Sequence, residues 1–143
     1  MSNHLYSNVD QNKLEVAYLA GGCYWGLEEL ISKIPGVKQT KVGFTGGHIK
    51  NVSYKEVTRG DTGHAESIEI KFKSKELSYE ELLFNFFKMH NPTTLNQQGN
   101  DKGTQYRSSI FYTNDEQKNI AQQVINIVNK SKKWSNPVLT EVI

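Results

Sequence analysis

The spacing of apolar side chains in the first half of the chain predicts three strands and one helix. Residues 14–20 are a short apolar run ended by two glycines, which is typical of a buried strand. Residues 37–44 predict a second strand, and residues 66–72 a third, whose alternation of apolar and charged side chains turns one face toward water. Between the first two strands, apolar side chains recur at helical spacing until Pro35 and Gly36 end the pattern; they are Leu27, Leu30, Ile31 and Ile34.

The second half of the chain predicts two helices and two strands. Ser78 followed by Glu81 forms a capping box, and the apolar stripe behind it consists of Tyr79, Leu82, Leu83, Phe86 and Phe87. Residues 106–113 predict a strand. Asn114 can cap a further helix, one face of which carries Ile120, Ala121, Val124, Ile125 and Val128. Residues 137–143 predict the last strand.

The order of these elements, β-α-β-β-α-β-α-β, predicts an α+β fold. We expect a two-layer sandwich with a ferredoxin-like core, in which helices pack on one mixed sheet. A chain of this length can bury a core of its own, so we expect a single domain over residues 1–143, with residues 1–12 as a flexible arm. Residues 45–63 and 93–105 are polar, lack an apolar period and are candidate site loops.

Charge and composition exclude several classes of protein. Seventeen lysines and arginines against fifteen acidic residues give a net charge of +2, and the basic residues are scattered, so we expect no nucleic-acid partner. No segment approaches the roughly 20 apolar residues that span a bilayer, and the first residues lack the pattern of a signal peptide. One cysteine allows no internal disulfide and fits a reducing compartment, which favours the cytoplasm.

The one cysteine, Cys23, lies where a predicted strand ends and a predicted helix begins. A helix N-terminus presents unpaired backbone N–H groups and the positive end of the macrodipole, so it favours a thiolate. Tyr24 and Trp25 are the next two residues, and their rings can form the wall of a small apolar pocket. Adjacent helical positions cannot both face the core. A lone cysteine is commonly just a small hydrophobe, but this context predicts a nucleophile.

Four segments together resemble one family, the peptide methionine sulfoxide reductases of the A type. They are the cysteine motif at 21–26, a glycine-containing segment at 42–47, and the segments at 60–66 and 98–108. The resemblance runs from about Val16 to the end of the chain. Four motifs in the same order are far more specific than the cysteine motif alone.

The resemblance implies an enzyme that reduces the S epimer of methionine sulfoxide, free or within oxidised proteins. In that family the thiolate, here Cys23, attacks the sulfoxide sulfur and ends as a sulfenic acid. Glu66 matches the position of the acid that protonates the departing oxygen, and the hydroxyls of Tyr54 and Tyr106 match its hydrogen-bond donors. A carboxyl held near a thiolate and aromatic rings should favour its protonated form.

The remaining family positions concern substrate binding and scaffold. Tyr24 and Trp25 would hold the methyl group of the substrate, and Asp101 would support the site through hydrogen bonds. Gly63 and His64 match scaffold positions. No metal and no bound cofactor are implied.

Two departures from the family pattern concern how the enzyme is recycled. Many relatives have a second cysteine where this chain has Thr58, and many have a resolving cysteine near the C-terminus. An external thiol must therefore reduce Cys23: thioredoxin, glutaredoxin, glutathione or dithiothreitol, or a cysteine on a fused or partner domain. Relatives also continue beyond the strand that ends at Ile143, which leaves open a naturally short member or a fragment.

Two other functions stay open at this point. Cys23, His64 and Asn100 have the residue types of the nucleophile, base and orienting group of a cysteine hydrolase, although their spacing does not require it. A non-catalytic module that binds oxidised methionine is the other alternative.

Overall fold

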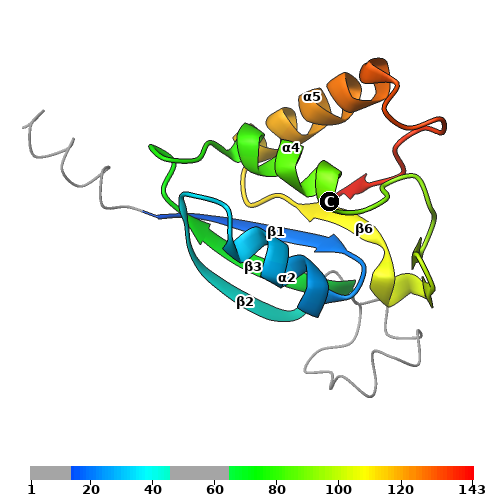
Figure 1. Cartoon of the computed structure of the whole chain (residues 1–143). Coiled ribbons are helices and arrows are strands. Elements are labelled where there is room, and N and C mark those ends of the chain that lie inside the picture. The colour runs from blue at the N-terminus through cyan, green and yellow to red at the C-terminus, as the bar shows by residue number, and fades with distance from the viewer. Residues whose placement is uncertain (1–13, 46–64) are drawn as a thin grey trace, which may run out of the picture.

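The computed structural model describes residues 14–45 and 65–143, and every structural statement below concerns these two ranges (Figure 1). The predicted arm and most of the glycine-rich loop at 45–63 lie outside them. The elements in chain order are β1 (Glu15–Gly21), α2 (Tyr24–Ser32), β2 (Val37–Thr45), β3 (Ala65–Phe72), α4 (Tyr79–Met89), β4 (Gln97–Gln98), β5 (Asp101–Lys102), the 3₁₀ turn η1 (Thr104–Tyr106), β6 (Ser108–Phe111), α5 (Asp115–Ser131) and β7 (Glu141–Val142).

Five of the strands form one sheet in the order β2-β3-β1-β6-β7. The first four pair antiparallel, whereas β7 runs parallel to β6, so the sheet is mixed. The succession β1-α2-β2-β3-α4-β6 with β1 and β3 in the centre is the arrangement of a ferredoxin-like core. The predicted α+β fold is confirmed.

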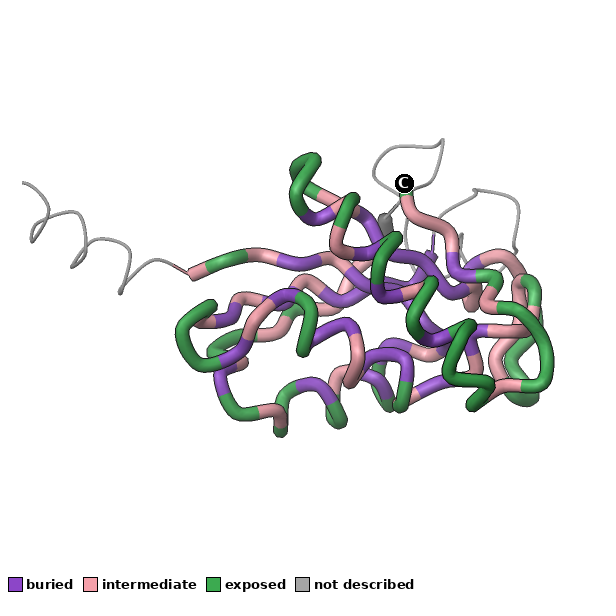
Figure 2. Tube along the Cα trace, turned by 90° about the horizontal axis from the view of Figure 1, so that it is seen from above, coloured by how far each residue is buried: buried purple, intermediate pink, exposed green. Residues whose placement is uncertain are grey.

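The three helices contribute to a single hydrophobic core on one side of the sheet. Leu19 of β1 lies opposite Ile68 of β3 and Ile110 of β6, and all three side chains are fully buried. They pack with buried side chains of the helices, among them Ile31 from α2 and Val124 from α5. Figure 2 shows the buried residues gathered between the helices and the sheet and the exposed residues on the outer turns.

Local signals set the helix boundaries as the sequence predicts. The Ser78 hydroxyl accepts a hydrogen bond from the Glu81 N–H at 3.1 Å, and the Glu81 carboxylate accepts one from the Ser78 N–H at 3.4 Å, which completes the capping box. The Asn114 side chain caps α5 by accepting from the Gln117 N–H at 2.8 Å. Both predicted helix starts are confirmed.

Two predicted strands are longer than the observed ones. The strand expected over 106–113 covers only Ser108–Phe111, because pairing with β1 begins at Ser108 opposite Gly21. Tyr106 instead belongs to η1, so its placement in a strand is wrong. The strand expected over 137–143 reduces to two residues, because β7 pairs with only two positions of the short strand β6.

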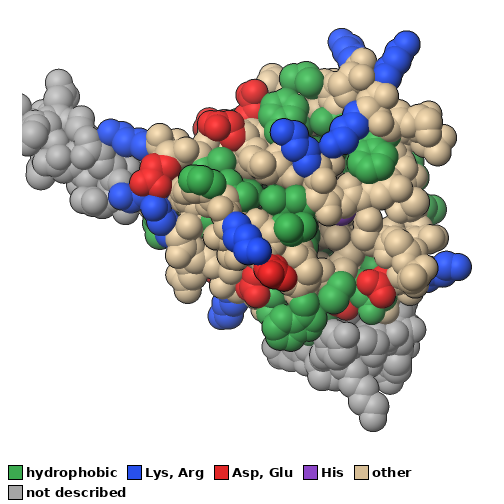
Figure 3. Space-filling view, viewed as in Figure 1, with side chains coloured by type: hydrophobic (Ala, Val, Ile, Leu, Met, Phe, Trp, Pro, Cys, Tyr) green, Lys and Arg blue, Asp and Glu red, His purple; other side chains and the backbone are tan. Residues whose placement is uncertain are grey.

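The described residues can be examined for membrane-spanning helices and for a basic surface. None of the helices within 14–45 and 65–143 has the length and apolar character needed to cross a bilayer. On the face shown in Figure 3, lysine and arginine side chains alternate with acidic ones and form no continuous basic stripe.

Candidate active site

Cys23 occupies the N-cap position of α2, directly after the turn that leaves β1. Its side chain is half-buried and makes no capping hydrogen bond, and its carbonyl accepts the first helical bond from the Leu27 N–H at 3.4 Å. The preceding Gly22 has a φ of +94°, a conformation that side chains with a Cβ rarely adopt. The thiol therefore lies at the positive end of α2, as the sequence predicts.

Glu66 brings a carboxyl group from β3 to the start of the same helix. Its side chain is only 1% exposed, on the side of the sheet that the helices cover. Oε1 accepts a hydrogen bond from the Tyr24 N–H at 3.3 Å, which satisfies one of the unpaired donors at the helix N-terminus. Oε2 is buried and has no hydrogen-bond partner among the described residues.

The surroundings of Glu66 favour its neutral form. Burial raises the pKa of the carboxyl above its usual range, and the nearby carboxylate of Asp101 raises it further. The hydrogen bond from Tyr24 lowers the pKa, but burial is the larger effect. A neutral carboxyl group that accepts through Oε1 has Oε2 left to carry its proton, and a group in this state can act as a proton donor.

Tyr24 and Trp25 differ in exposure, as expected for neighbours in a helix. Tyr24 is buried, and its ring meets the Trp25 ring edge to face at 5.5 Å between centroids and lies 5.9 Å from the Phe44 ring. Trp25 is 64% exposed. Phe44 pairs with Glu66 across β2 and β3, a neighbour that the sequence pattern does not identify because it depends on strand pairing.

The polar segment after α4 carries two other predicted site residues. Asp101 is exposed and lies in the small β4–β5 hairpin, opposite Gln98. Tyr106 is half-buried in η1, which packs against β3, the strand of Glu66. Asn100 is exposed in the same hairpin. The structure thus brings the segment that carries Asp101 and Tyr106 close to the strand that carries Glu66.

Several predicted residues lie outside the described ranges. Tyr54, Thr58, Gly63 and His64 all belong to residues 46–64, so their predicted roles stay predictions. Within the described ranges, no three side chains of the metal-binding types converge on a point that could hold an ion.

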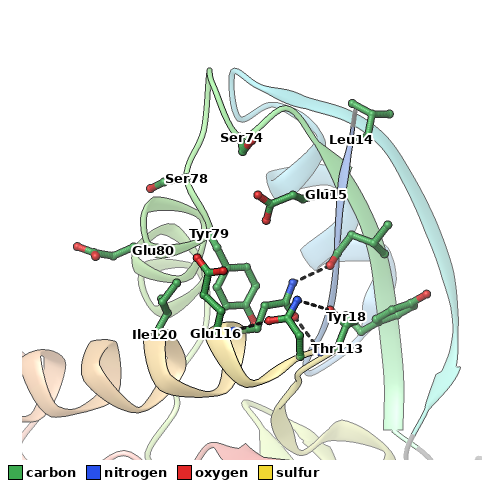
Figure 4. A pocket seen from close by; sticks show the side chains of 13 residues that line it. Leu14, Glu15, Tyr18, Ser74, Ser78, Tyr79, Glu80, Thr113, Glu116 and Ile120 are labelled. Carbon is green, nitrogen blue, oxygen red and sulfur yellow. Dashed lines mark hydrogen bonds between the residues drawn. The ribbon is translucent and has the colours of Figure 1, made fainter. Parts of the chain in front are cut away.

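A large cavity of about 840 Å³ lies far from this site, between β1, the start of α4 and the start of α5 (Figure 4). Its lining includes Glu15, Val16 and Tyr18 of β1, whereas Cys23 lies two residues beyond Gly21, the last residue of that strand. Gln117 is one of the lining residues. Its side-chain amide donates to the Val16 carbonyl at 2.9 Å and accepts from the Thr113 N–H at 3.0 Å. The bond to Val16 joins α5 to β1, and we assign the cavity no part in the chemistry at Cys23.

Comparison with known proteins associates the chain with one family. A family model described as peptide methionine sulfoxide reductase matches residues 15–143. The chain is 51% identical over 128 residues to peptide methionine sulfoxide reductase MsrA 2 of Rhodopirellula baltica, and this alignment covers 90% of the chain and 74% of that protein.

Two solved structures share the fold. Methionine sulfoxide reductase A of Corynebacterium diphtheriae has a TM-score of 0.86 at 34% identity, with 92% of this chain and 65% of that chain covered. Mxr1 of Saccharomyces cerevisiae in reduced form has a TM-score of 0.84 at 36% identity, with 90% and 75% covered.

Proposed function

The chain belongs to the peptide methionine sulfoxide reductase family, and we propose that Cys23 is its nucleophile and Glu66 its proton donor. It is an enzyme that reduces methionine sulfoxide with thiols. One observation carries the assignment of the two residues: the Glu66 carboxyl accepts a hydrogen bond at 3.3 Å from the residue that follows Cys23, and its other oxygen has no partner among the described residues.

The chemical step is an oxygen transfer between two sulfur atoms. The Cys23 thiolate attacks the sulfoxide sulfur, and Glu66 gives its proton to the sulfoxide oxygen, which gains negative charge as the sulfur is attacked. The oxygen then leaves with the Cys23 sulfur as a sulfenic acid, and methionine departs as the thioether. Cys23 loses two electrons and the substrate gains them, so no further oxidant or reductant enters this step.

Substrate recognition is proposed for the S epimer of methionine sulfoxide, free or within an oxidised protein. The sulfoxide carries a methyl group, which the aromatic rings of Tyr24 and Trp25 can contact beside the thiol. The hydroxyls of Tyr106 and Tyr54 would donate to the oxygen, and Asp101 would act on Glu66 through its charge. The exposure of Trp25 suits a substrate that is a protein surface.

Regeneration requires a thiol from outside these 143 residues, because Cys23 is the only cysteine among them. That thiol attacks the sulfenic sulfur, water leaves, and a mixed disulfide forms. A second thiol then releases Cys23 by disulfide exchange. We propose thioredoxin, glutaredoxin with glutathione, or a cysteine on a fused or partner domain as the source, in a reducing compartment such as the cytoplasm.

The test is turnover of resolved methionine sulfoxide epimers with excess dithiothreitol. The wild-type chain should convert the S epimer and leave the R epimer, and Cys23→Ser should abolish conversion. Without reductant, one equivalent of substrate should add a single oxygen to Cys23, as read by mass spectrometry.

The same assay separates the other two functions. Binding of the sulfoxide without any turnover would support a non-catalytic module and overturn the proposal. Ester or amide hydrolysis that depends on His64 would support the cysteine hydrolase. Neither alternative is favoured by the family relationship.

A further inference from the structure

Gln98 lies where three parts of the site meet. It is the last residue of β4 and pairs with Asp101 across the β4–β5 hairpin. Its side chain reaches Asn91, just beyond α4, and its methylene groups lie against Gly22, just before Cys23. One side chain therefore connects the hairpin both to the end of α4 and to the turn before α2.

The amide of Gln98 holds Asn91 by two hydrogen bonds. Oε1 accepts from the Asn91 N–H at 2.8 Å, and Nε2 donates to the Asn91 carbonyl at 2.8 Å. The side chain thus pairs with both polar groups of one residue, as a neighbouring strand would. Asn91 is itself held in place, because the preceding His90 is buried and hydrogen-bonded to Phe86 and Ser108.

The aliphatic part of the same side chain rests on Gly22. A Cβ placed on Gly22 would lie 2.7 Å from Cγ of Gln98 and 2.8 Å from its Cβ, distances that real Cβ atoms essentially never show. The absence of a side chain at Gly22 therefore lets Gln98 approach the backbone directly before the nucleophile.

The third connection runs through the hairpin to Glu66. Asp101 stands opposite Gln98, and among the described residues its carboxylate is the charged group that acts on Glu66. The Coulomb energy between two carboxylates depends on their separation. An interaction that holds the hairpin in place therefore also sets the separation between Asp101 and Glu66, and with it the Coulomb energy between their carboxylates.

We propose that Gln98 is a positioning residue, whose grip on Asn91 holds the hairpin of Asp101 against the turn that presents Cys23. This inference rests on the proposed roles of Cys23 and Glu66. Gln98 itself touches no reacting atom. It acts by keeping the separation between Asp101 and Glu66 constant and by supporting the backbone at Gly22.

The first experiment compares Gln98→Ala and Gln98→Met with Gln97→Ala. Methionine keeps the methylene groups on Gly22 and removes both hydrogen bonds, so it isolates the grip on Asn91. Gln97 is the neighbouring position of the same strand, and its amide donates to the Gly99 carbonyl within the hairpin, at 3.3 Å. We expect kcat/KM for the S epimer to fall about tenfold in both Gln98 variants, since a misplacement of about 1 Å can cost about a hundredfold, and to stay unchanged in Gln97→Ala.

The second readout separates positioning from general destabilisation. Isotope-edited NMR of the Glu66 carboxyl carbon should show its pKa fall in the Gln98 variants, because a loosened hairpin lets Asp101 move away. In an Asp101→Asn background, Gln98→Met should produce no further fall in that pKa. The titration needs no turnover, so it can succeed or fail independently of the proposed reaction.

Two results would overturn the inference. One is an unchanged Glu66 titration and unchanged kcat/KM in Gln98→Met while thermal melting shows a folded protein. The other is a fall of the pKa in Gln98→Met that is equally large in the wild-type and the Asp101→Asn backgrounds, which would mean that Gln98 does not act through Asp101.

Discussion

At the scale of single residues, Glu66 combines a structural role with the chemical role that we propose for it. Oε1 accepts from the Tyr24 N–H, the first backbone donor of α2, at a helix start where the Cys23 thiol makes no capping bond. Oε2 has no hydrogen-bond partner among the described residues, and we propose that this atom carries the proton. A neutral acid can fill both roles at once, and burial favours that neutral state by raising the pKa.

Replacing Glu66 with glutamine should remove the proton transfer and preserve the fold. The amide oxygen of Glu66→Gln can still accept from Tyr24, but the amide has no acidic proton to give. We expect kcat to fall by about 10²- to 10⁴-fold, the range that general acid catalysis contributes. Since only the protonated acid donates, wild-type activity should decline as pH rises through the raised pKa of Glu66, and this decline should be absent in the variant.

The matched control is Glu69→Gln on the same strand. Glu69 accepts a hydrogen bond from the Tyr18 hydroxyl at 3.1 Å. It lies three residues after Glu66 on β3, so its side chain is on the opposite face of the sheet, away from the helices. Its variant should keep kcat and the pH profile. Full activity of Glu66→Gln would rule out Glu66 as the acid.

At the scale of secondary structure, the sequence predicts what local signals determine. Ser78 and Asn114 fix helix starts with side chains that bond within four residues, so both positions are readable without the fold. The predictions that Tyr106 and residues 137–140 lie in strands are wrong. The length of a strand depends on its pairing partner, which is distant in sequence. Phe44 is missed for the same reason, since only the pairing of β2 with β3 sets it opposite Glu66.

The capping box at the start of α4 should contribute measurably to stability. In Ser78→Ala the Glu81 N–H loses its acceptor, and we expect the free energy of unfolding to drop by about 1 kcal/mol. Chemical denaturation monitored by circular dichroism measures this. Ser74→Ala, an exposed position just before the helix, should change stability by less than about 0.5 kcal/mol. Equal effects of the two substitutions would contradict a capping role.

At the scale of the whole molecule, a buried chain of hydrogen bonds joins α4, β6 and the C-terminal segment. His90 must donate through Nδ1 to the Phe86 carbonyl at 2.8 Å, so its neutral ring accepts through Nε2 from the Ser108 hydroxyl at 2.7 Å. The Ser108 oxygen is then free to accept from the Thr140 hydroxyl at 2.6 Å. With His90 neutral, the chain of donors therefore runs from Thr140 through Ser108 to His90 and on to the Phe86 carbonyl.

The burial of His90 makes the stability of the fold depend on pH. Burial lowers the pKa of His90 from 6.5 to about 4, so the unfolded chain binds a proton more readily than the folded one between these values. The contribution should be complete above pH 6.5 and lost as pH falls toward 4. It amounts to about 3 kcal/mol at most, since one pKa unit corresponds to about 1.4 kcal/mol.

Denaturant unfolding of the wild type and of His90→Gln at several pH values between about 4 and 7 measures the contribution. The variant has no titrating ring at this position, whereas the other histidines and the carboxyl groups are common to both proteins. Its absolute stability should be lower near neutral pH, because the glutamine cannot reproduce both hydrogen bonds. The difference between the two proteins should shrink as pH falls, since only the wild type loses the His90 contribution. Parallel curves across this range would show that His90 is not the titrating group.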